Sequence, residues 1–410
     1  MGASKIPDWV REELFEDVLK SNVVGYSKVR SFNAENGSSA GENYASIMLR
    51  VNIEVELLDG TNKHVSYMVK LPHQNDVHKE LMEHINIFEI ERTMYKVVVP
   101  EMEALYKAAG VEVTFGAKSY ELRNAKSEYI ALEDLCTKGF KNASRLDGLD
   151  QAHTEGVLRK MAQWHAATAV RVATKGQYPE GVLKSFFKEE NRAKINEMMN
   201  GMGEIFLKCC ATYEGNEAYI DKLKALKPVI LDEMFKMGKV DSTEFNVLNH
   251  GDSWSNNFMF QYDDFGKVKE VYMVDYQVPK YGIVAHDLIY FLISFTKLED
   301  KLSKFDYYLR VYHDNLVEHL KILKYSKPMP SLRDIHKTLF QYGLFIYCVA
   351  TGVMAVVLVD PSKDACFENF TGDSAEGKEF QTKMYSNARY RKHIQAILPW
   401  LLNRGALDID

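Results

Sequence analysis

The segment His250-Gly251-Asp252-Ser253-Trp254-Ser255-Asn256-Asn257 places an aspartate two residues after a histidine and five residues before an asparagine. An apolar stretch follows, Val271-Tyr272-Met273-Val274, which has the composition of a β-strand and ends at Asp275. Asp252 by itself would be interpreted as a turn residue, because aspartate is common in turns. Its spacing from Asn257 and Asp275 instead indicates a functional site made of two carboxylates and one amide.

These three side chains are the groups that phosphoryl transfer requires. A carboxylate orients the attacking hydroxyl group, and oxygen ligands hold the magnesium ion that neutralises the nucleotide phosphates. We therefore assign Asp252 as the catalytic base, and Asn257 and Asp275 as magnesium ligands. Magnesium usually keeps waters and phosphate oxygens in its octahedral shell, so two protein ligands suffice. The sequence predicts a kinase, although residues 275–277 are Asp-Tyr-Gln where protein kinases have Asp-Phe-Gly.

The chain resembles the ecdysteroid kinase-like family, which belongs to the aminoglycoside and choline kinase superfamily of phosphotransferases. The resembling motifs are Leu248 to Asp252, Asn257 to Phe260, Asp275 to Gln277 and Ala285 to Leu292. The resemblance extends from about Gly41 to the last helices. It implies an α+β, bilobal, protein kinase-like fold with a small β-rich N-lobe and a larger, mainly helical C-lobe. It also implies ATP and Mg²⁺ as cofactors.

The resemblance assigns supporting roles to four further residues. His250 is expected to hold the loop by hydrogen bonding, and Asp287 to support the loop from downstream. Lys70 would reach the α- and β-phosphates of the nucleotide, with its ammonium group fixed by Glu91 on the following helix. Weaker candidates for this partner are Glu83 and Glu89. A surface lysine and a solvated helix glutamate are the plainer interpretations of Lys70 and Glu91.

Other nucleotide contacts are expected from a loop and a hinge. Gly41, Asn43 and Ser46 match a Gly-x-Asn-Tyr-x-Ser element of the family, whose small residues let backbone N–H groups approach phosphate oxygens. A glycine- and serine-rich loop without function is the alternative. The segment Glu133 to Leu135 follows an apolar strand, and its backbone is expected to bind adenine.

Hydrophobic periodicity predicts the elements of the two lobes. Residues 46–56 alternate between apolar and polar, which indicates a half-buried strand. Further expected elements of the N-lobe are a turn at Asp59-Gly60, a return strand over residues 65–70, a helix over 78–95, and short strands around 111–115 and 129–132. Helices are expected from Asp150 onward, including residues 305–323 and 380–402. The predicted divisions are an N-lobe over residues 1–132, a hinge over 133–140 and a C-lobe over 141–410.

One apolar run, from Tyr342 to Val359, reaches the length at which a membrane span must be considered. Gly343 and Gly352 interrupt it, and basic or aromatic belts do not flank both ends. We therefore predict a buried central helix of the C-lobe. The first six residues lack the apolar core of a signal peptide.

The bulk composition is that of an ordinary soluble globular protein. The 410 residues carry a formal net charge of −6, which gives no basic footprint for nucleic acid. The five cysteines include no Cys-x-x-Cys spacing, which fits a reduced protein better than a disulfide scaffold. A cytoplasmic protein without a membrane span is expected, and the sequence carries no signal of an oligomeric state.

The predicted function is ATP-dependent phosphorylation of a small-molecule alcohol. The resemblance implies an ecdysteroid or a related steroid or xenobiotic alcohol as acceptor, a role in detoxification, and an insect source. Two alternatives stay open: a choline or ethanolamine kinase, which needs an aromatic and acidic cage for its cation, and a catalytically inactive binding protein for apolar ligands. The side chains of Met198, Met199, Met202 and Phe206 form either an apolar acceptor pocket or the buried stripe of a helix, and we favour the latter.

Overall fold

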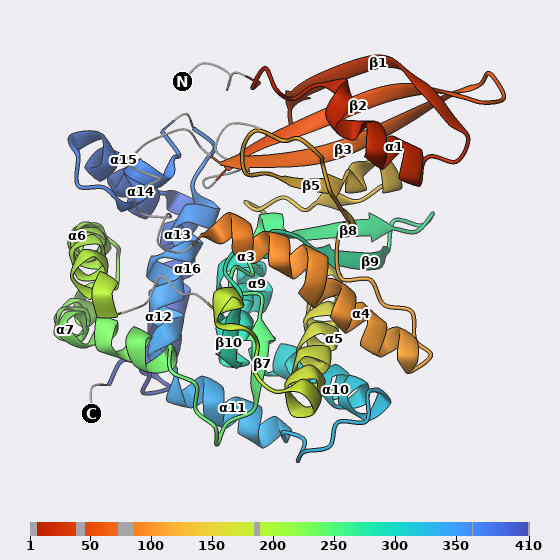
Figure 1. The fold of residues 1–410 in the computed structure, drawn as a ribbon. Coiled ribbons are helices and arrows are strands. Elements are labelled where there is room, and N and C mark those ends of the chain that lie inside the picture. Colours follow the sequence, from red (N-terminus) through yellow and green to blue (C-terminus); the bar gives the residue numbers. More distant parts are fainter. Residues whose placement is uncertain (1–5, 38–45, 73–85, 184–188, 363, 409–410) are drawn as a thin grey trace.

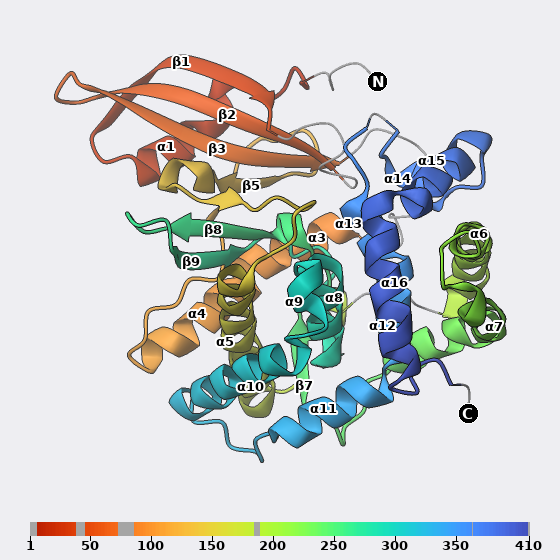
Figure 2. The ribbon, with the colours of Figure 1, turned by 180° about the vertical axis from the view of Figure 1, so that it is seen from behind.

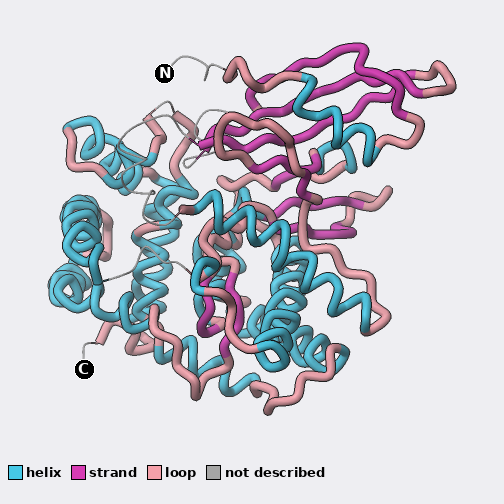
Figure 3. The backbone as a smooth tube through the Cα atoms, in the orientation of Figure 1, coloured by secondary structure: helices cyan, strands magenta, loops and turns pink. Residues whose placement is uncertain are grey.

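The structure, a computed structural model, describes residues 6–37, 46–72, 86–183, 189–362 and 364–408. It confirms the α+β, bilobal, protein kinase-like fold. A β-rich part made from the first third of the chain lies over a mainly helical part made from the rest (Figure 1). The tube representation shows most of the strands gathered in the upper part of the molecule and helices filling the lower part (Figure 3).

The N-terminal sheet has five antiparallel strands in the order β1-β2-β3-β5-β4. They are β1 (Tyr26–Asn36), β2 (Ser46–Leu57), β3 (Asn62–Pro72), β4 (Ser119–Tyr120) and β5 (Ile130–Glu133). Every second residue of β2 from Leu49 to Val55 is fully buried, and these side chains pack with Phe15 and Leu19 at helix α1 (Glu16–Asn22). The central strand β3 pairs with β2 on one side and β5 on the other, which fixes the backbone at Lys70.

Three parts of the N-lobe differ from the sequence-based expectations. Strand β1 was not predicted, because its side chains are mostly polar and exposed and give no apolar alternation. Residues 111–115 form no strand; they instead run past β9, where the carbonyl of Phe115 accepts a hydrogen bond from the N–H of Met273 (2.8 Å). Part of the helix expected over 78–95 lies outside the described residues. The helical path that is described continues further, through α3 (Ile87–Thr93), a π-helical turn (Met94–Val98) and α4 (Val99–Ala108).

Helices make up most of the C-lobe, together with short strands around the central loop. The helices are α5 (Gln151–Lys175), α6 (Arg192–Cys210), α7 (Ile220–Met237), α8 (Ala285–Phe295), α9 (Leu298–Lys301), α10 (Phe305–Ile322), α11 (Leu332–Gln341), α12 (Leu344–Thr351), α13 (Val353–Leu358), α14 (Phe367–Thr371), α15 (Ala375–Ser386) and α16 (Ala388–Leu402). The strands are β6 (Lys141–Asn142), β7 (Asn246–Asn249), β8 (Phe258–Tyr262), β9 (Val268–Met273) and β10 (Lys280–Ile283). They form the antiparallel sheets β6-β8-β9 and β10-β7. From behind, α5 and α10 lie side by side below β8 and β9 (Figure 2).

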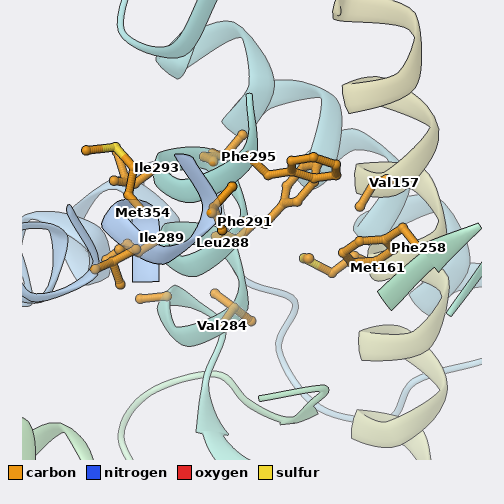
Figure 4. Packing of buried hydrophobic residues seen from close by; sticks show 14 of the residues in the cluster. Val157, Met161, Phe258, Val284, Leu288, Ile289, Phe291, Ile293, Phe295 and Met354 are labelled. Carbon is orange, nitrogen blue, oxygen red and sulfur yellow. The ribbon is translucent and has the colours of Figure 1, made fainter. Parts of the chain in front are cut away.

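Helix α8 lies at the centre of the C-lobe core. Its apolar side chains pack between Val157 and Met161 of α5 on one side and Met354 of α13 on the other (Figure 4). Leu288 and Phe291 of α8 are fully buried. Burial of large apolar side chains on both flanks fixes the position of this helix, because each one contributes about 1.5–3 kcal/mol. The polar residues that α8 carries are therefore held at defined places.

Two long helices expected near the C-terminus are each broken into two. The apolar run 342–359 contains α12 and α13, which are separated at Gly352, and most of its side chains are buried. Residues 380–402 are divided between α15 and α16, because Asn387 adopts an extended conformation and its side chain caps α16 through the N–H of Arg389 (2.8 Å).

No single helix in the described part of the chain is long and apolar enough to cross a bilayer. One bent pair, Leu332–Gln341 with Leu344–Leu358, passes the test of length and composition, with an angle of 66° between its two parts.

Candidate active site

Asp287 of α8 anchors the loop that follows β7. Its Oδ2 accepts a hydrogen bond from the N–H of His250 (2.7 Å). Its Oδ1 accepts from the N–H of Gly251 (3.0 Å) and from the hydroxyl of Ser253 (2.8 Å), and His165 Nε2 lies 3.1 Å from Oδ2. Burial opposes ionisation of this carboxyl group, but its hydrogen bond with His165 and the nearby donors outweigh burial and lower the pKa of Asp287 to about 2. The buried carboxylate thus fixes the backbone of residues 250–253.

Gly251 is the point at which this loop requires a glycine. Its φ is +83°, and a Cβ atom here would collide with the carbonyl oxygen of Val278. We expect Gly251→Ala to lower the free energy of unfolding by about 3 kcal/mol, because the strain of a positive φ and the clash add. Gly266→Ala is the matched control, since Gly266 has a φ of +75° with nothing within 4 Å of the added carbon. Urea denaturation tests this difference, and equal losses in the two variants would contradict the close approach to Val278.

The carboxylate of Asp252 is held at both oxygens. The hydroxyl of Tyr290 donates to Oδ1 (2.7 Å), and Nδ2 of Asn257 donates to Oδ2 (3.0 Å) and to the backbone carbonyl of Asp252 (2.8 Å). The pKa of Asp252 is raised above its ordinary value, because burial and the charge of Asp275 outweigh the hydrogen bonds from Tyr290 and Asn257, which lower it. Neutral donors therefore orient the carboxylate before any ligand binds. Such fixed orientation is what a group needs in order to align a hydroxyl group for reaction.

His250 connects this loop to the end of β9. Its Nε2 lies 2.9 Å from the carbonyl of Val274, and its Nδ1 lies 3.3 Å from the N–H of Asp252. Because the first partner only accepts and the second only donates, the ring carries its proton on Nε2. Asp275 follows directly, in the left-handed region at a φ of +65°, and its N–H donates to the hydroxyl of Tyr95 (3.2 Å). A non-glycine residue in this conformation indicates a position that the surrounding structure enforces.

Lys70 joins the two lobes through its ammonium group. Its Nζ lies 2.7 Å from Glu91 Oε2 and 2.6 Å from Asp275 Oδ1. Burial by itself would lower the pKa of Lys70, but the charges of Asp275 and Glu91 outweigh this effect and raise it. Burial also raises the pKa of Glu91, because its carboxylate is removed from water. The sequence-predicted Lys70, Glu91 and Asp275 thus lie in one chain of contacts.

The other sequence-predicted nucleotide residues are only partly within the described residues. Ser46 opens β2 and is buried. Glu133 ends β5, and Leu135 begins the 3₁₀ helix Leu135–Lys138 with its side chain buried. Gly41 and Asn43 lie outside the described residues.

Asn257 and Asp275 have the donor chemistry of a magnesium site. Because Nδ2 of Asn257 faces the acceptor atoms of Asp252, the oxygen of this amide is the end that would meet a cation. The carboxylate of Asp275 supplies a second oxygen ligand, and hard cations such as Mg²⁺ prefer such oxygens. Among the described residues, no group of three or more His, Cys, Asp or Glu could hold a metal ion by itself. The donor set therefore fits an ion whose shell is completed by phosphate oxygens and water.

Several residues of the site were not predicted from the sequence. Tyr290 lies in the quoted motif 285–292, three positions after Asp287, but in the sequence it belongs to an apolar helical stretch. Tyr95 and His165 come from helices distant in sequence. Asp134 is buried in the predicted hinge, where its carboxylate accepts from Arg50, Ser66 and Cys136 at 2.8–3.0 Å. Only the fold brings these side chains to their partners.

A groove of about 970 Å³ lies between α6 and α15. Met198, Met202 and Ile205 contribute apolar surface to it, and Lys194 and Glu204 are among its charged residues. Met202 and Phe206 are buried, as the buried-stripe interpretation predicted. Met198 and Met199 are only partly buried, and Met198 lines the groove.

The chain matches the sequence model of a known protein family. The sequence model of the ecdysteroid kinase-like family matches residues 40–325, a range that contains Lys70, Glu91, Asp252, Asn257 and Asp275. A search of curated proteins gave no match.

Proposed function

Because the chain belongs to the ecdysteroid kinase-like family, we propose that it transfers the γ-phosphoryl group of ATP to a hydroxyl group of a small molecule. The acceptor in this proposal is an ecdysteroid or a related steroid or xenobiotic alcohol. The observation that carries the proposal is the position of Asp275, which contacts Lys70 at 2.6 Å and directly follows Val274, whose N–H donates to the carbonyl of Asn257 (3.0 Å). This position supports a single site in which Lys70 binds phosphate and Asp252 binds the acceptor hydroxyl.

Asp252 orients the acceptor in the proposed reaction. An acceptor hydroxyl would donate its hydrogen to a carboxylate oxygen of Asp252, which Tyr290 and Asn257 hold in place. As the acceptor oxygen bonds to the γ-phosphorus, the bond from phosphorus to the leaving oxygen of ADP breaks, and Asp252 takes the hydroxyl proton. Alignment and charge neutralisation supply the rate enhancement, and no covalent enzyme intermediate forms.

Nucleotide binding would use residues of both lobes. Lys70 supplies positive charge for the α- and β-phosphates, and Asn257 and Asp275 would hold the cation. When bound, Mg²⁺ would neutralise the phosphate charge that develops during transfer. The phosphate loop with Gly41, Asn43 and Ser46 and the backbone at Glu133 and Leu135 are proposed to bind the phosphates and adenine. We place the hinge at residues 133–140, between lobes 1–132 and 141–410.

Glu91→Gln tests the role of the buried ion pair. The amide keeps the shape of the side chain but removes one of the two negative charges that hold Lys70. In the variant, the carboxylate of Asp275 is the charge that remains beside Lys70. A hydrogen bond to a charged group contributes about 1.5–3 kcal/mol, so we expect the KM for ATP to rise on the order of tenfold or more. Steady-state kinetics at saturating acceptor measures this change. Glu89→Gln is the control because Glu89 is exposed, and it should leave the KM unchanged.

A panel of acceptors tests the function and separates it from the alternatives. The protein is incubated with MgATP and ecdysteroids, choline, ethanolamine or phenolic glycosides, and products are identified by mass spectrometry. Phosphorylated ecdysteroid or glycoside supports the proposal, and phosphocholine favours the choline kinase alternative. Binding of an apolar acceptor without any phosphorylated product would favour the inactive binding protein. A phosphate dianion would make an apolar alcohol more soluble, which is the proposed link to detoxification.

A further inference from the structure

Asp134 carries a buried carboxylate that the proposed reaction does not use. It lies directly after β5, in the segment proposed as the hinge. Its Oδ2 accepts hydrogen bonds from Arg50 Nε and from the hydroxyl of Ser66, both at 2.8 Å. Its Oδ1 accepts from the N–H of Cys136 (3.0 Å). Each oxygen of this carboxylate is therefore held by at least one donor, which offsets the cost of burying its charge.

These contacts join three parts of the N-lobe. Arg50 belongs to β2, Ser66 belongs to β3, and the N–H of Cys136 belongs to the hinge segment itself. Strand β3 lies between β2 and β5 in the sheet (Figure 1), so Asp134 at the end of β5 reaches back over both neighbouring strands. We call the contacts of Asp134 with Arg50, Ser66 and the N–H of Cys136 the hinge clamp.

The hinge clamp and Lys70 share one face of the sheet. Successive side chains of a strand point to opposite faces, and Tyr67 and Val69 of β3 pack into the apolar cluster around α1. Ser66 and Lys70 therefore both point to the other face. They are four residues apart, which corresponds to roughly 13 Å along the strand. The clamp thus fixes the hinge at a set distance from the ammonium group proposed to bind phosphate.

The backbone beside the clamp offers a hydrogen-bond donor. The N–H of Leu135 has no hydrogen-bond partner among the described residues, because the side chain of Asp134 accepts from Cys136 instead. Adenine presents an acceptor, N1, beside its donating N6 amino group. Guanine presents a donating N1–H beside its accepting O6. A backbone N–H that is held in place can therefore pair with N1 of adenine but meets another donor on guanine.

We infer that Asp134 is a positioning residue that sets the preference of the nucleotide site for adenine. The hinge clamp holds the N–H of Leu135 where it meets N1 of adenine while the phosphates of the same nucleotide reach Lys70. Without the clamp, the hinge backbone is free to shift relative to β3, so the base loses its fixed partner and the phosphates keep theirs. This inference rests on the proposed function and deepens it, because it concerns the base that the site selects.

The test is calorimetric titration of non-hydrolysable ATP and GTP analogues, with Mg²⁺, into the full-length protein. The wild type should bind the ATP analogue about tenfold or more tightly than the GTP analogue, the effect of one hydrogen bond made or left unpaired. Asp134→Asn keeps the size of the side chain, but both carboxylate oxygens face donors, so the amide NH₂ meets a donor in either orientation. Affinity for the ATP analogue should fall about tenfold in this variant, and affinity for the GTP analogue should change little.

Two milder variants test the clamp without removing the buried carboxylate. Arg50→Gln and Ser66→Ala each take away one partner of Asp134, and both side chains are partly exposed. Each should lower the preference for the ATP analogue, Arg50→Gln by more because its hydrogen bond is between charged groups. Arg50→Gln should add little to the effect of Asp134→Asn, since the two substitutions break the same contact.

Asp150→Ala is the control for a loss of stability alone. Asp150 caps α5 in the C-lobe by accepting a hydrogen bond from the N–H of His153 (3.0 Å). Loss of this cap should lower the Tm. The preference for the ATP analogue over the GTP analogue should stay at the wild-type value, because the hinge clamp is intact in this variant.

Three results would overturn the inference: equal affinity of the wild type for the two analogues, an unchanged preference in all three clamp variants, or an equal loss of affinity for both analogues. Binding of neither analogue by the wild type would refute the proposed function together with the inference. A preference that depends on the clamp, without phosphoryl transfer to any acceptor of the panel, would refute the proposed reaction and leave the role of Asp134 standing.

Discussion

Asp252→Asn is expected to reduce kcat by about 10³-fold, because a positioned general base contributes about 10²–10⁴-fold to a proton-transfer step. The amide keeps the size of the side chain and can still accept a hydrogen bond from Tyr290, whose hydroxyl lies 2.7 Å from the carboxylate in the wild type. It cannot accept the acceptor's proton. The affinities for nucleotide and acceptor should therefore change little, and single-turnover measurement with bound acceptor isolates the chemical step.

Asp264→Asn is the matched control for this substitution. Asp264 lies in the exposed turn between β8 and β9, so the variant should retain the wild-type kcat. Retention of more than a tenth of the wild-type kcat in Asp252→Asn would contradict the role of Asp252 as base. A loss of nucleotide affinity equal to the loss of kcat would instead assign Asp252 to binding.

Asp287→Ala is expected to give the largest loss of stability. It removes a fully buried carboxylate and leaves the N–H groups of His250 and Gly251 without their acceptor. Breaking a buried charged network costs about 3–5 kcal/mol, so the free energy of unfolding should fall by that amount. The loop that carries Asp252 loses its anchor as well, so kcat should fall even under conditions where the variant is folded.

The pH dependence of stability gives this prediction a second readout. The folded-state pKa of Asp287 is about 2, below the ordinary value of 3.8. A carboxyl group with a depressed pKa contributes stability above its unfolded pKa, and this contribution is lost as the pH falls toward its folded pKa. As the pH falls from about 4 to about 2, the free energy of unfolding of the wild type should therefore decrease by about 2 kcal/mol more than that of the variant.

Urea denaturation at several pH values measures both effects of Asp287→Ala. Asp306→Ala removes an exposed carboxylate from the first turn of α10 and should change stability by no more than about 0.5 kcal/mol. A similarly small change in Asp287→Ala would show that the loop does not depend on this anchor.

The sequence was most informative where chemistry requires fixed spacing. Asp252, Asn257 and Asp275 are close in sequence and flank short strands, so their spacing alone predicted a common site. Strand β2 was predictable because one of its faces is buried and the other is partly exposed, which produces strict alternation. The family resemblance added the bilobal fold, which the structure confirms.

Features created by tertiary contacts could not be predicted in this way. Tyr290 is one aromatic residue in an apolar helix, and only the packing of α8 directs its hydroxyl to Asp252. Strand β1 has few apolar residues, since it lies at the edge of the sheet and leaves much of its surface exposed. Gly352 is visible in the sequence as an interruption of the apolar run, because glycine is a poor helix former, but the contacts that α12 and α13 make with α8 come only from the fold.

The central claim is transfer of the γ-phosphoryl group of ATP to a small-molecule hydroxyl at Asp252. The most direct measurement follows the label from [γ-³²P]ATP in a single turnover with Mg²⁺ and ecdysone, using the wild type and Asp252→Asn in parallel. We expect the label to appear in an ecdysone phosphate with the wild type, and about 10³-fold more slowly with the variant. Label that stays in ATP, appears only as inorganic phosphate, or reaches the acceptor equally fast with both proteins would contradict the claim.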